Sequence, residues 1–239
     1  MNGVVVSVNL SATPYKSYEE NIEGFNHQRF LYAQHSPTNE TLQSVLDSTK
    51  HVKKYNISKQ PQDQINLDIG GVVGDTHFFP ITEIEENGER FLQRRIAEVN
   101  FFQLTEYDRL NQLFGTNVGP GSLGENITTA GINLDSLPVN TILQVGSAKV
   151  KILARRSFCF KFVNTFMPDK DFWTLADRQK FDRARVGIVG QVIEPGVVKA
   201  SDTITAILSD QIDPMPIPAI PEKYTRNKVI DEQLPSMLK

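Results

Sequence analysis

The stretch Gly119-Pro-Gly-Ser-Leu-Gly-Glu-Asn126 decides between two fold classes, because it contains the pattern G-x-G-x-x-G. In dinucleotide-binding folds this pattern joins a strand to a helix, and the N-terminus of that helix binds the pyrophosphate. Here the glycines are followed by Ile127-Thr-Thr129, whose β-branched residues favour a strand over a helix. We therefore predict that the glycines do not form a dinucleotide-binding loop.

Short segments rich in Val and Ile recur along the chain and are separated by Gly, Pro, Asn or Asp. This pattern is typical of a sheet or barrel rather than of alternating strands and helices. The predicted strands are Gly3–Asn9, Ile65–Ile69, Glu98–Gln103, Thr141–Gly146, Ala148–Ala154, Gly187–Glu194 and Thr203–Leu208. Gly146-Ser147 lies between two of them and is expected to form a hairpin turn.

Three segments carry apolar residues at helical spacing. They are Asn39–Lys53, Thr105–Phe114 and Asp169–Arg183. Thr105 opens a sequence similar to a capping box, so its hydroxyl is expected to accept a bond from a free backbone N–H. Gly115 is expected to end that helix.

Other segments are polar or rich in proline. The mixed-charge segment Glu85–Arg95 is interpreted as a surface loop, in which Arg94 or Arg95 is a minor candidate for binding an anion. A cluster of lysines is interpreted as a solvated helix face, and the alternative is that it supplies cations to a prosthetic group that carries a phosphate: Lys50, Lys53, Lys54 and Lys59. Asp213–Tyr224 contains four prolines and is expected to be extended, since proline cannot donate a ladder hydrogen bond.

Composition excludes several classes of protein. The net charge of −3 and the lack of a clustered basic face give no reason to expect nucleic acid. No apolar run is long enough to span a bilayer, so no membrane is expected. The single cysteine, Cys159, rules out an intrachain disulfide and a multi-cysteine metal site, and it favours a reducing, cytoplasmic location.

Five motifs, in order along the chain, resemble the MOSC domain, the C-terminal domain of molybdenum-cofactor sulfurases. They are GGVVGDTH (70–77), SLGENITTAGINL (122–134), LPVNTILQVG (137–146), RSFCFK (156–161) and RVGIVGQVIEPGVVKASD (185–202). The sequence departs from the family at Phe158, where the family has proline, and at Ser201, where it has glycine. The resemblance implies a mostly β, barrel-like fold with a few peripheral helices. It also implies a domain over residues 1–211, with an insertion at 11–64, followed by a Pro-rich tail at 212–239.

The resemblance further implies a molybdenum-cofactor-binding protein in which Cys159 is the sulfur ligand of molybdenum. Such a protein would be a molybdenum-dependent oxidoreductase that reduces N-hydroxylated small molecules. No flavin, haem or iron–sulfur motif is present, so its electrons would come from a separate electron-transfer protein. One alternative is a sulfur carrier, in which Cys159 takes a persulfide from a pyridoxal phosphate-dependent cysteine desulfurase. Another is a cofactor-binding module without catalysis.

Cys159 lies in the aromatic segment FCFKF, where a free cysteine can be buried and inert. Arg155, Arg156 and Lys161 are close in sequence and would favour the thiolate that nucleophilic or metal-ligand chemistry needs. In an unbroken strand Cys159 shares a face with Arg155, whereas the family spacing selects Arg156. All three cations are therefore candidate cofactor-binding residues.

Gly124, Glu125 and Asn126 are further candidates for binding the cofactor. Gly124 would bring backbone N–H groups close to an anion, Asn126 would donate to a pterin or phosphate, and Glu125 would orient a base or bond a pterin amine. The alternative is ordinary turn chemistry. Asp75 and His77 are candidate catalytic residues, since an Asp beside a His can hold an imidazole tautomer for proton transfer. Alternatively, Asp75 caps loop backbone and His77 is packed.

Overall fold

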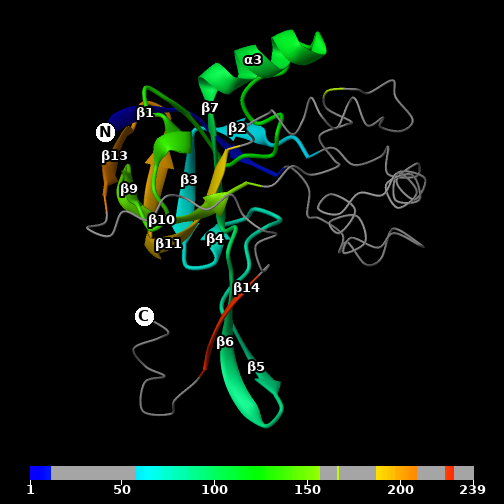
Figure 1. The fold of residues 1–239 in the computed structure, drawn as a ribbon, viewed down its shortest axis with the longest axis vertical. Helices are drawn as coiled ribbons and strands as arrows, with labels where there is room; N and C mark the ends of the chain where they lie inside the picture. Colours follow the sequence, from blue (N-terminus) through cyan, green and yellow to red (C-terminus); the bar gives the residue numbers. More distant parts are fainter. Residues whose placement is uncertain (12–56, 157–165, 167–186, 209–223, 229–239) are drawn as a thin grey trace, which may run out of the picture.

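The computed structural model describes residues 1–11, 57–156, 166, 187–208 and 224–228 (Figure 1). The predicted helices Asn39–Lys53 and Asp169–Arg183 lie outside these residues. Cys159 and Lys161 also lie outside them.

Seven strands close into a barrel, which confirms the mostly β prediction. In order around the barrel they are β13 (Thr203–Ile207), β9 (Ile142–Val145), β10 (Ala148–Arg155), β11 (Ile188–Glu194), β7 (Val99–Gln103), β8 (Ile127–Ala130) and β1 (Asn2–Leu10). Pairing of β13 with β1 closes the ring. Neighbouring strands are antiparallel except β7 and β8, which run parallel. A short strand, β2 (Gln60–Gln62), adds to the far end of β1.

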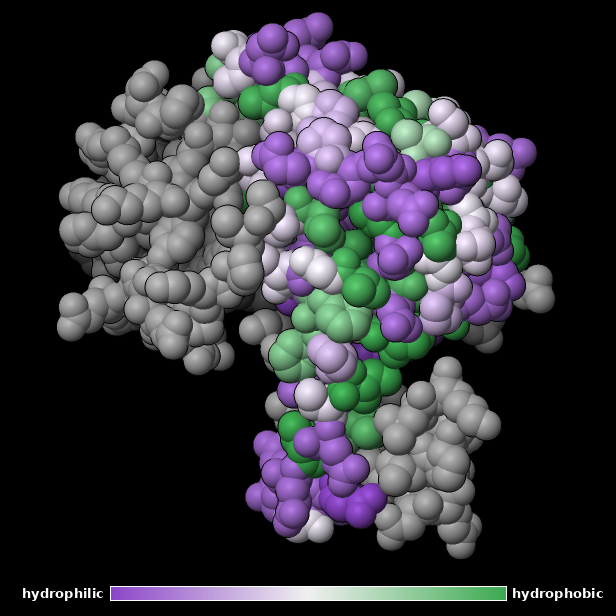
Figure 2. Space-filling view, turned by 180° about the vertical axis from the view of Figure 1, so that it is seen from behind, coloured by the Kyte–Doolittle hydropathy of each residue, from purple (hydrophilic) through white to green (hydrophobic). Residues whose placement is uncertain are grey.

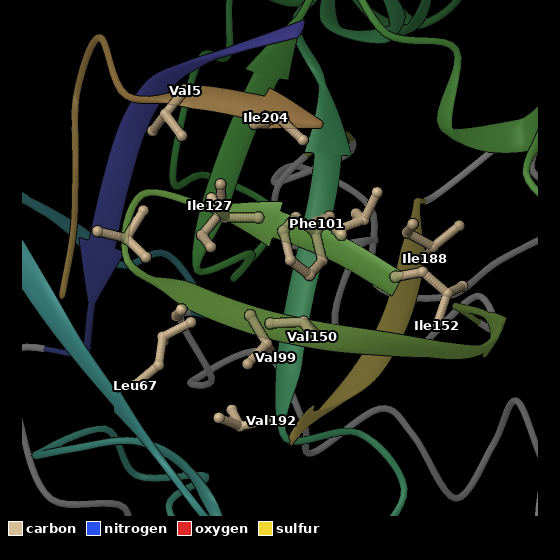
Figure 3. Packing of buried hydrophobic residues seen from close by; sticks show 14 of the residues in the cluster. Val5, Leu67, Val99, Phe101, Ile127, Val150, Ile152, Ile188, Val192 and Ile204 are labelled. Carbon is tan, nitrogen blue, oxygen red and sulfur yellow. The ribbon is translucent and has the colours of Figure 1, made fainter. Parts of the chain in front are cut away.

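The barrel interior is filled by branched and aromatic side chains from every part of the sheet. Phe101, Ile127, Val150 and Ile204 are fully buried and lie within one cluster (Figure 3). The strand β10 alternates strictly between buried and partly exposed residues, as expected when one face of a sheet is packed. The predicted strands are confirmed, with boundaries that differ by at most one residue.

A second, three-stranded sheet packs beside the barrel. It consists of β12 (Gly196–Lys199), β3 (Gln64–Asp68) and β4 (Gly71–Val72). Leu67 and Val198 join the barrel cluster, so the two sheets share one core. The chain leaves β4 into a loop whose end returns to β4, where the Phe79 N–H bonds the Gly70 carbonyl at 3.0 Å.

A third sheet forms an arm that projects away from the barrel (Figure 1). The arm consists of β5 (Thr82–Glu86), β6 (Glu89–Arg95) and β14 (Tyr224–Lys228). The interpretation of Glu85–Arg95 as a surface loop is therefore wrong. Asn87 and Gly88 both have positive φ, as a two-residue hairpin turn requires, and the Asn-Gly pair was a local signal for it. Hydrophilic residues gather at the free end of the arm (Figure 2).

One α-helix lies in the described part of the chain, α3 (Leu104–Phe114), followed later by a 3-10 turn, η1 (Leu134–Ser136). Gly115 ends α3 in the left-handed region, as predicted. The predicted capping role of Thr105 is wrong, because the cap is Gln103 and no side chain bonds the free N–H groups there. The hairpin turn at Gly146, with φ of 55°, is confirmed.

Candidate functional site

Polar side chains are buried together where strands begin and end at one end of the barrel. They come from four segments of the fold: the end of β1, the residues before β2, the loop after β4 and the residues before β8. They are Asn9, Lys59, Asp75, Glu125 and Asn126, each no more than 6% exposed. Buried polar groups are costly unless they are bonded, so their partners define the chemistry of the site.

Lys59 and Asp75 form a buried ion pair with 2.7 Å between Nζ and Oδ2. Placing Lys59 on a solvated face is therefore wrong. Burial lowers the pKa of Lys59, and the charge of Arg156 lowers it further, although Asp75 opposes the shift. Burial alone would raise the pKa of Asp75, but hydrogen bonds from His77 and the charge of Lys59 outweigh it, so the pKa is lowered. Asp75 is therefore a carboxylate at neutral pH.

Asp75 also organises its own loop. Its Oδ1 accepts from the His77 N–H at 2.8 Å and lies 3.3 Å from the His77 ring Nδ1. Its Oδ2 accepts from the Asn126 amide at 3.2 Å. Asp75 and His77 lie in turns and not on a strand, so Asp75 both caps backbone and contacts the imidazole. Burial lowers the pKa of His77, and Arg95 and Lys59 contribute to the shift.

Glu125 has one fully bonded oxygen. Its Oε1 accepts from the Gly121 N–H at 2.6 Å, the Tyr107 hydroxyl at 2.6 Å and the Thr128 hydroxyl at 2.8 Å. Burial, together with the charge of Glu125, raises the pKa of Tyr107, which therefore stays a donor. The other oxygen, Oε2, is buried and has no hydrogen-bond partner among the described residues. The same holds for the side-chain nitrogen of Asn9.

The glycine loop packs against the protein's own backbone. Gly121 and Gly124 have φ of 86° and 69°, and a Cβ at Gly124 would lie 2.7 Å from the Ile57 carbonyl oxygen. The Lys59 N–H bonds the Gly121 carbonyl at 2.9 Å. The loop leads into β8 and not into a helix, so the exclusion of a dinucleotide-binding loop is confirmed. The glycines let residues 57–59 approach and thereby place Lys59.

The structure separates the two candidate arginines. Arg155, at the end of β10, donates to the Asp135 carbonyl at 2.9 Å, away from the glycine loop. Arg156 lies beside that loop, with its Nη2 3.6 Å from where a Cβ of Gly124 would be. Arg156 therefore joins the site and Arg155 does not.

Arg94 and Arg95, the two minor candidates for binding an anion, lie at the end of β6 and differ in their partners. Arg94 donates to both oxygens of the buried Glu98, at 2.6 and 2.9 Å, so it is held by that carboxylate. Arg95 donates to the His77 carbonyl at 3.3 Å and thus reaches the edge of the site.

Sequence reasoning missed three residues of the site. Tyr107 was expected only as part of an apolar helix stripe, Lys59 only as part of a solvated face, and Asn9 only as the end of a strand. Within the described residues, no three His, Cys, Asp or Glu side chains are grouped closely enough to hold a metal ion. In the same part of the chain, no helix has the length and apolar character needed to cross a membrane.

Comparison with known proteins assigns the family. Residues 89–205 match the MOSC domain family. The chain carries a MOSC domain. The resemblance noted in the sequence is thus confirmed, and the matched residues include Glu125, Asn126 and Arg156 of the site.

Two solved structures share the fold of this MOSC protein. The YuaD protein from Bacillus subtilis is 16% identical, with a TM-score of 0.56, over 86% of this chain and 96% of that one. YiiM from Geobacillus stearothermophilus is 14% identical, with a TM-score of 0.53, over 89% of this chain and 78% of that one. At these identities the likeness shows the fold alone. A search of curated proteins finds no match to the sequence.

Proposed function

We propose that this MOSC protein binds the molybdenum cofactor at the site and reduces N-hydroxylated small molecules with electrons from a separate protein. One observation carries the proposal: two cations, Lys59 and Arg156, and the side chain of Asn9 lie beside the glycine loop of the family-matched domain. Lys59 and Asn9 are buried donors. Among the described residues the side-chain nitrogen of Asn9 has no hydrogen-bond partner, and the Lys59 ammonium pairs only with the Asp75 carboxylate. A phosphate-bearing group supplies acceptors for such donors.

The residues present fit a pterin that carries a phosphate. The Lys59 ammonium has three N–H donors, and among the described residues Asp75 is its one side-chain partner. Glu125 offers the opposite property, since its free Oε2 is a buried acceptor suited to an amine. Lys59, Arg156 and Asn9 would therefore hold the anionic part and Glu125 an N–H donor of the pterin. When bound, the molybdenum would supply the two-electron chemistry, with Cys159 as the proposed sulfur ligand.

The protein's own residues would orient and desolvate the reacting groups. Tyr107, Gly121 and Thr128 fix one oxygen of Glu125, so its second oxygen is held in place. Asp75 stabilises the charged form of Lys59 in a region that excludes water. Preorganised charges in such a region act more strongly than they would in water.

The alternative proposal is a persulfide carrier that receives sulfur on Cys159 from a cysteine desulfurase. It uses the same thiol and the same cations, since Arg156 is close to Cys159 in the sequence and a neighbouring cation favours the reactive thiolate. A third proposal is a module that holds the cofactor without turnover. Because the chain has a single cysteine, we propose a reducing, cytoplasmic location for each of them.

The test is metal and pterin analysis of the full chain, purified from a host that makes the cofactor. We expect molybdenum and pterin in the wild-type protein and at least a roughly tenfold loss in Arg156→Met, since a lost charge-assisted bond is worth about 1.5–3 kcal/mol. Arg155→Met is the matched control and should retain both. Sulfane sulfur on Cys159 without molybdenum would favour the carrier. Equal retention by the two arginine variants would contradict the proposed site.

A further inference from the structure

Two hydroxyl groups connect His77 to the buried ion pair. The Thr76 hydroxyl lies 3.2 Å from His77 Nδ1, and the Ser11 hydroxyl lies 3.1 Å from the Thr76 hydroxyl. The Ser11 hydroxyl in turn donates to Asp75 Oδ2, at 3.5 Å the longest link. That same oxygen lies 2.7 Å from Lys59 Nζ. The bonds therefore form an unbroken chain from an imidazole to an ammonium.

The two ends of this chain differ in their access to water. The side chain of His77 is 37% exposed, whereas those of Asp75 and Lys59 are 1% exposed. Thr76 and Ser11 can each accept one hydrogen bond and donate another, so every bond can point the same way. A hydroxyl that accepts and donates at once can pass a proton without changing its own charge.

We propose that Thr76 and Ser11 form a proton path that reprotonates Lys59 from solvent through His77. The His77 Nδ1–H bond breaks as a proton joins the Thr76 oxygen, and the Thr76 hydroxyl proton moves to the Ser11 oxygen. The Ser11 hydroxyl proton then moves to Asp75 Oδ2 and from there to the lone pair of neutral Lys59 Nζ. His77, which starts as the imidazolium, ends neutral and regains its proton from a hydronium ion of the solvent, which becomes water, so charge and atoms balance.

The surrounding charges suit both ends of the path. His77 faces Asp75, Arg95 and Lys59, and its partial burial and the two cations lower its pKa, so its imidazolium form releases a proton readily. Lys59 faces Asp75, Arg156 and Glu125, and its pKa is lowered by burial, so it too can give up a proton. The path itself needs no cofactor.

Use of the path in catalysis rests on the proposed function. Reduction of an N–OH group to N–H and water consumes two protons with its two electrons. A buried donor that is refilled from solvent would meet that demand.

The test measures exchange of the Lys59 ammonium hydrogens with water, by nitrogen-15 NMR of the cofactor-free full chain. We expect Thr76→Val and Ser11→Ala each to slow exchange by roughly tenfold, the factor that corresponds to one ordinary hydrogen bond. Thr76→Ser should restore the rate. Thr141→Val is the control, because Thr141 lies outside the path and its hydroxyl also makes a hydrogen bond, to the Pro138 carbonyl at 2.8 Å.

Unchanged exchange in the folded Thr76→Val or Ser11→Ala protein would overturn the proposal. So would slowing that occurs only when His77→Phe is made, because the direct contact between His77 and Asp75 would then carry the proton. The two variants break different links, so the loss of one to misfolding leaves the other decisive. The readout requires neither molybdenum nor turnover, so its failure is distinguishable from failure of the proposed function.

Discussion

Lys59 Nζ lies 2.7 Å from Asp75 Oδ2, and both side chains are almost completely buried. The pair joins the segment before β2 to the loop after β4, so it holds together two parts of the chain around the candidate site. Removing two charges from water is costly, and the cost is repaid only while both partners remain. The pair should therefore behave as a unit.

Single and double substitutions of the pair measure that coupling. We expect Lys59→Met and Asp75→Leu each to lower the free energy of unfolding by about 3–5 kcal/mol, because each leaves a buried charge without its partner. The double variant should lose less than the sum of the two. Urea denaturation provides the measurement, and additive losses would show that the two charges do not interact.

Acid should weaken the fold through Asp75. The folded-state pKa of Asp75 lies below its ordinary value of 3.8, so the folded state binds this proton less readily than the unfolded chain does. The stability it contributes is complete above that ordinary value and is lost as pH falls toward the lowered pKa. Urea midpoints between pH 7 and pH 3 should therefore fall more steeply in wild type than in Asp75→Asn. Parallel curves would mean that Asp75 has an ordinary pKa.

Alanine substitutions at three glycines distinguish the stability cost of backbone strain from the cost of a close contact with the new Cβ. Gly115 and Gly124 have the same φ of 69°, but a Cβ has open space at Gly115 and meets the Ile57 carbonyl at Gly124. Gly115→Ala should cost about 1–2 kcal/mol from strain alone, and Gly124→Ala clearly more. Gly119→Ala, with open space and no positive φ, should be neutral. Equal costs at Gly115 and Gly124 would remove the close-contact explanation.

A β-branched residue at Gly124 should also abolish retention of the proposed cofactor, because Lys59 and Arg156 both lie against this loop. Circular dichroism should still show a folded barrel. Normal molybdenum and pterin content in folded Gly124→Val would show that the loop is an ordinary turn with no role in cofactor binding.

Alkylation of Cys159 tests the chemistry expected of that thiol. Neighbouring cations should lower its pKa below about 8.5, so iodoacetamide should react readily with cofactor-free protein at neutral pH. Bound molybdenum should protect the thiol, whereas a persulfide carrier should instead gain sulfur after incubation with a desulfurase and cysteine. If Cys159 resists alkylation in the folded, cofactor-free protein and reacts only after unfolding, both proposals are contradicted.

Deletion of 224–239 tests the arm. The strand β14 pairs with β6 over five residues, so its removal frees one edge of the arm. Backbone amides of β6 should exchange faster with deuterium, while those of β7 and β11 should keep wild-type rates because they lie in the barrel. Faster exchange throughout the barrel would show that the arm supports the whole fold.

The sequence by itself determined the barrel strands, the end of α3, the exclusion of a dinucleotide loop and the family. Runs of Val and Ile between turn residues, a glycine after an apolar helix stripe and motifs in a fixed order are all local signals, which the sequence displays without tertiary contacts. The hairpin of the arm was also readable from Asn87-Gly88, and it was missed because the flanking charges resemble those of a loop.

Only the tertiary structure decided which residues form the site. Lys59 lies in the polar segment SKQPQ, and nothing local distinguishes it from a solvated lysine. It is buried because of contacts with distant residues. Its backbone N–H donates to the carbonyl of Gly121 in the glycine loop, more than 60 positions away, and its ammonium pairs with the Asp75 carboxylate. Arg156 was separated from Arg155 for the same reason, since side-chain direction at a strand end depends on what packs there. Burial and ion pairing are properties of contacts between distant segments, and these exist only once the barrel has closed.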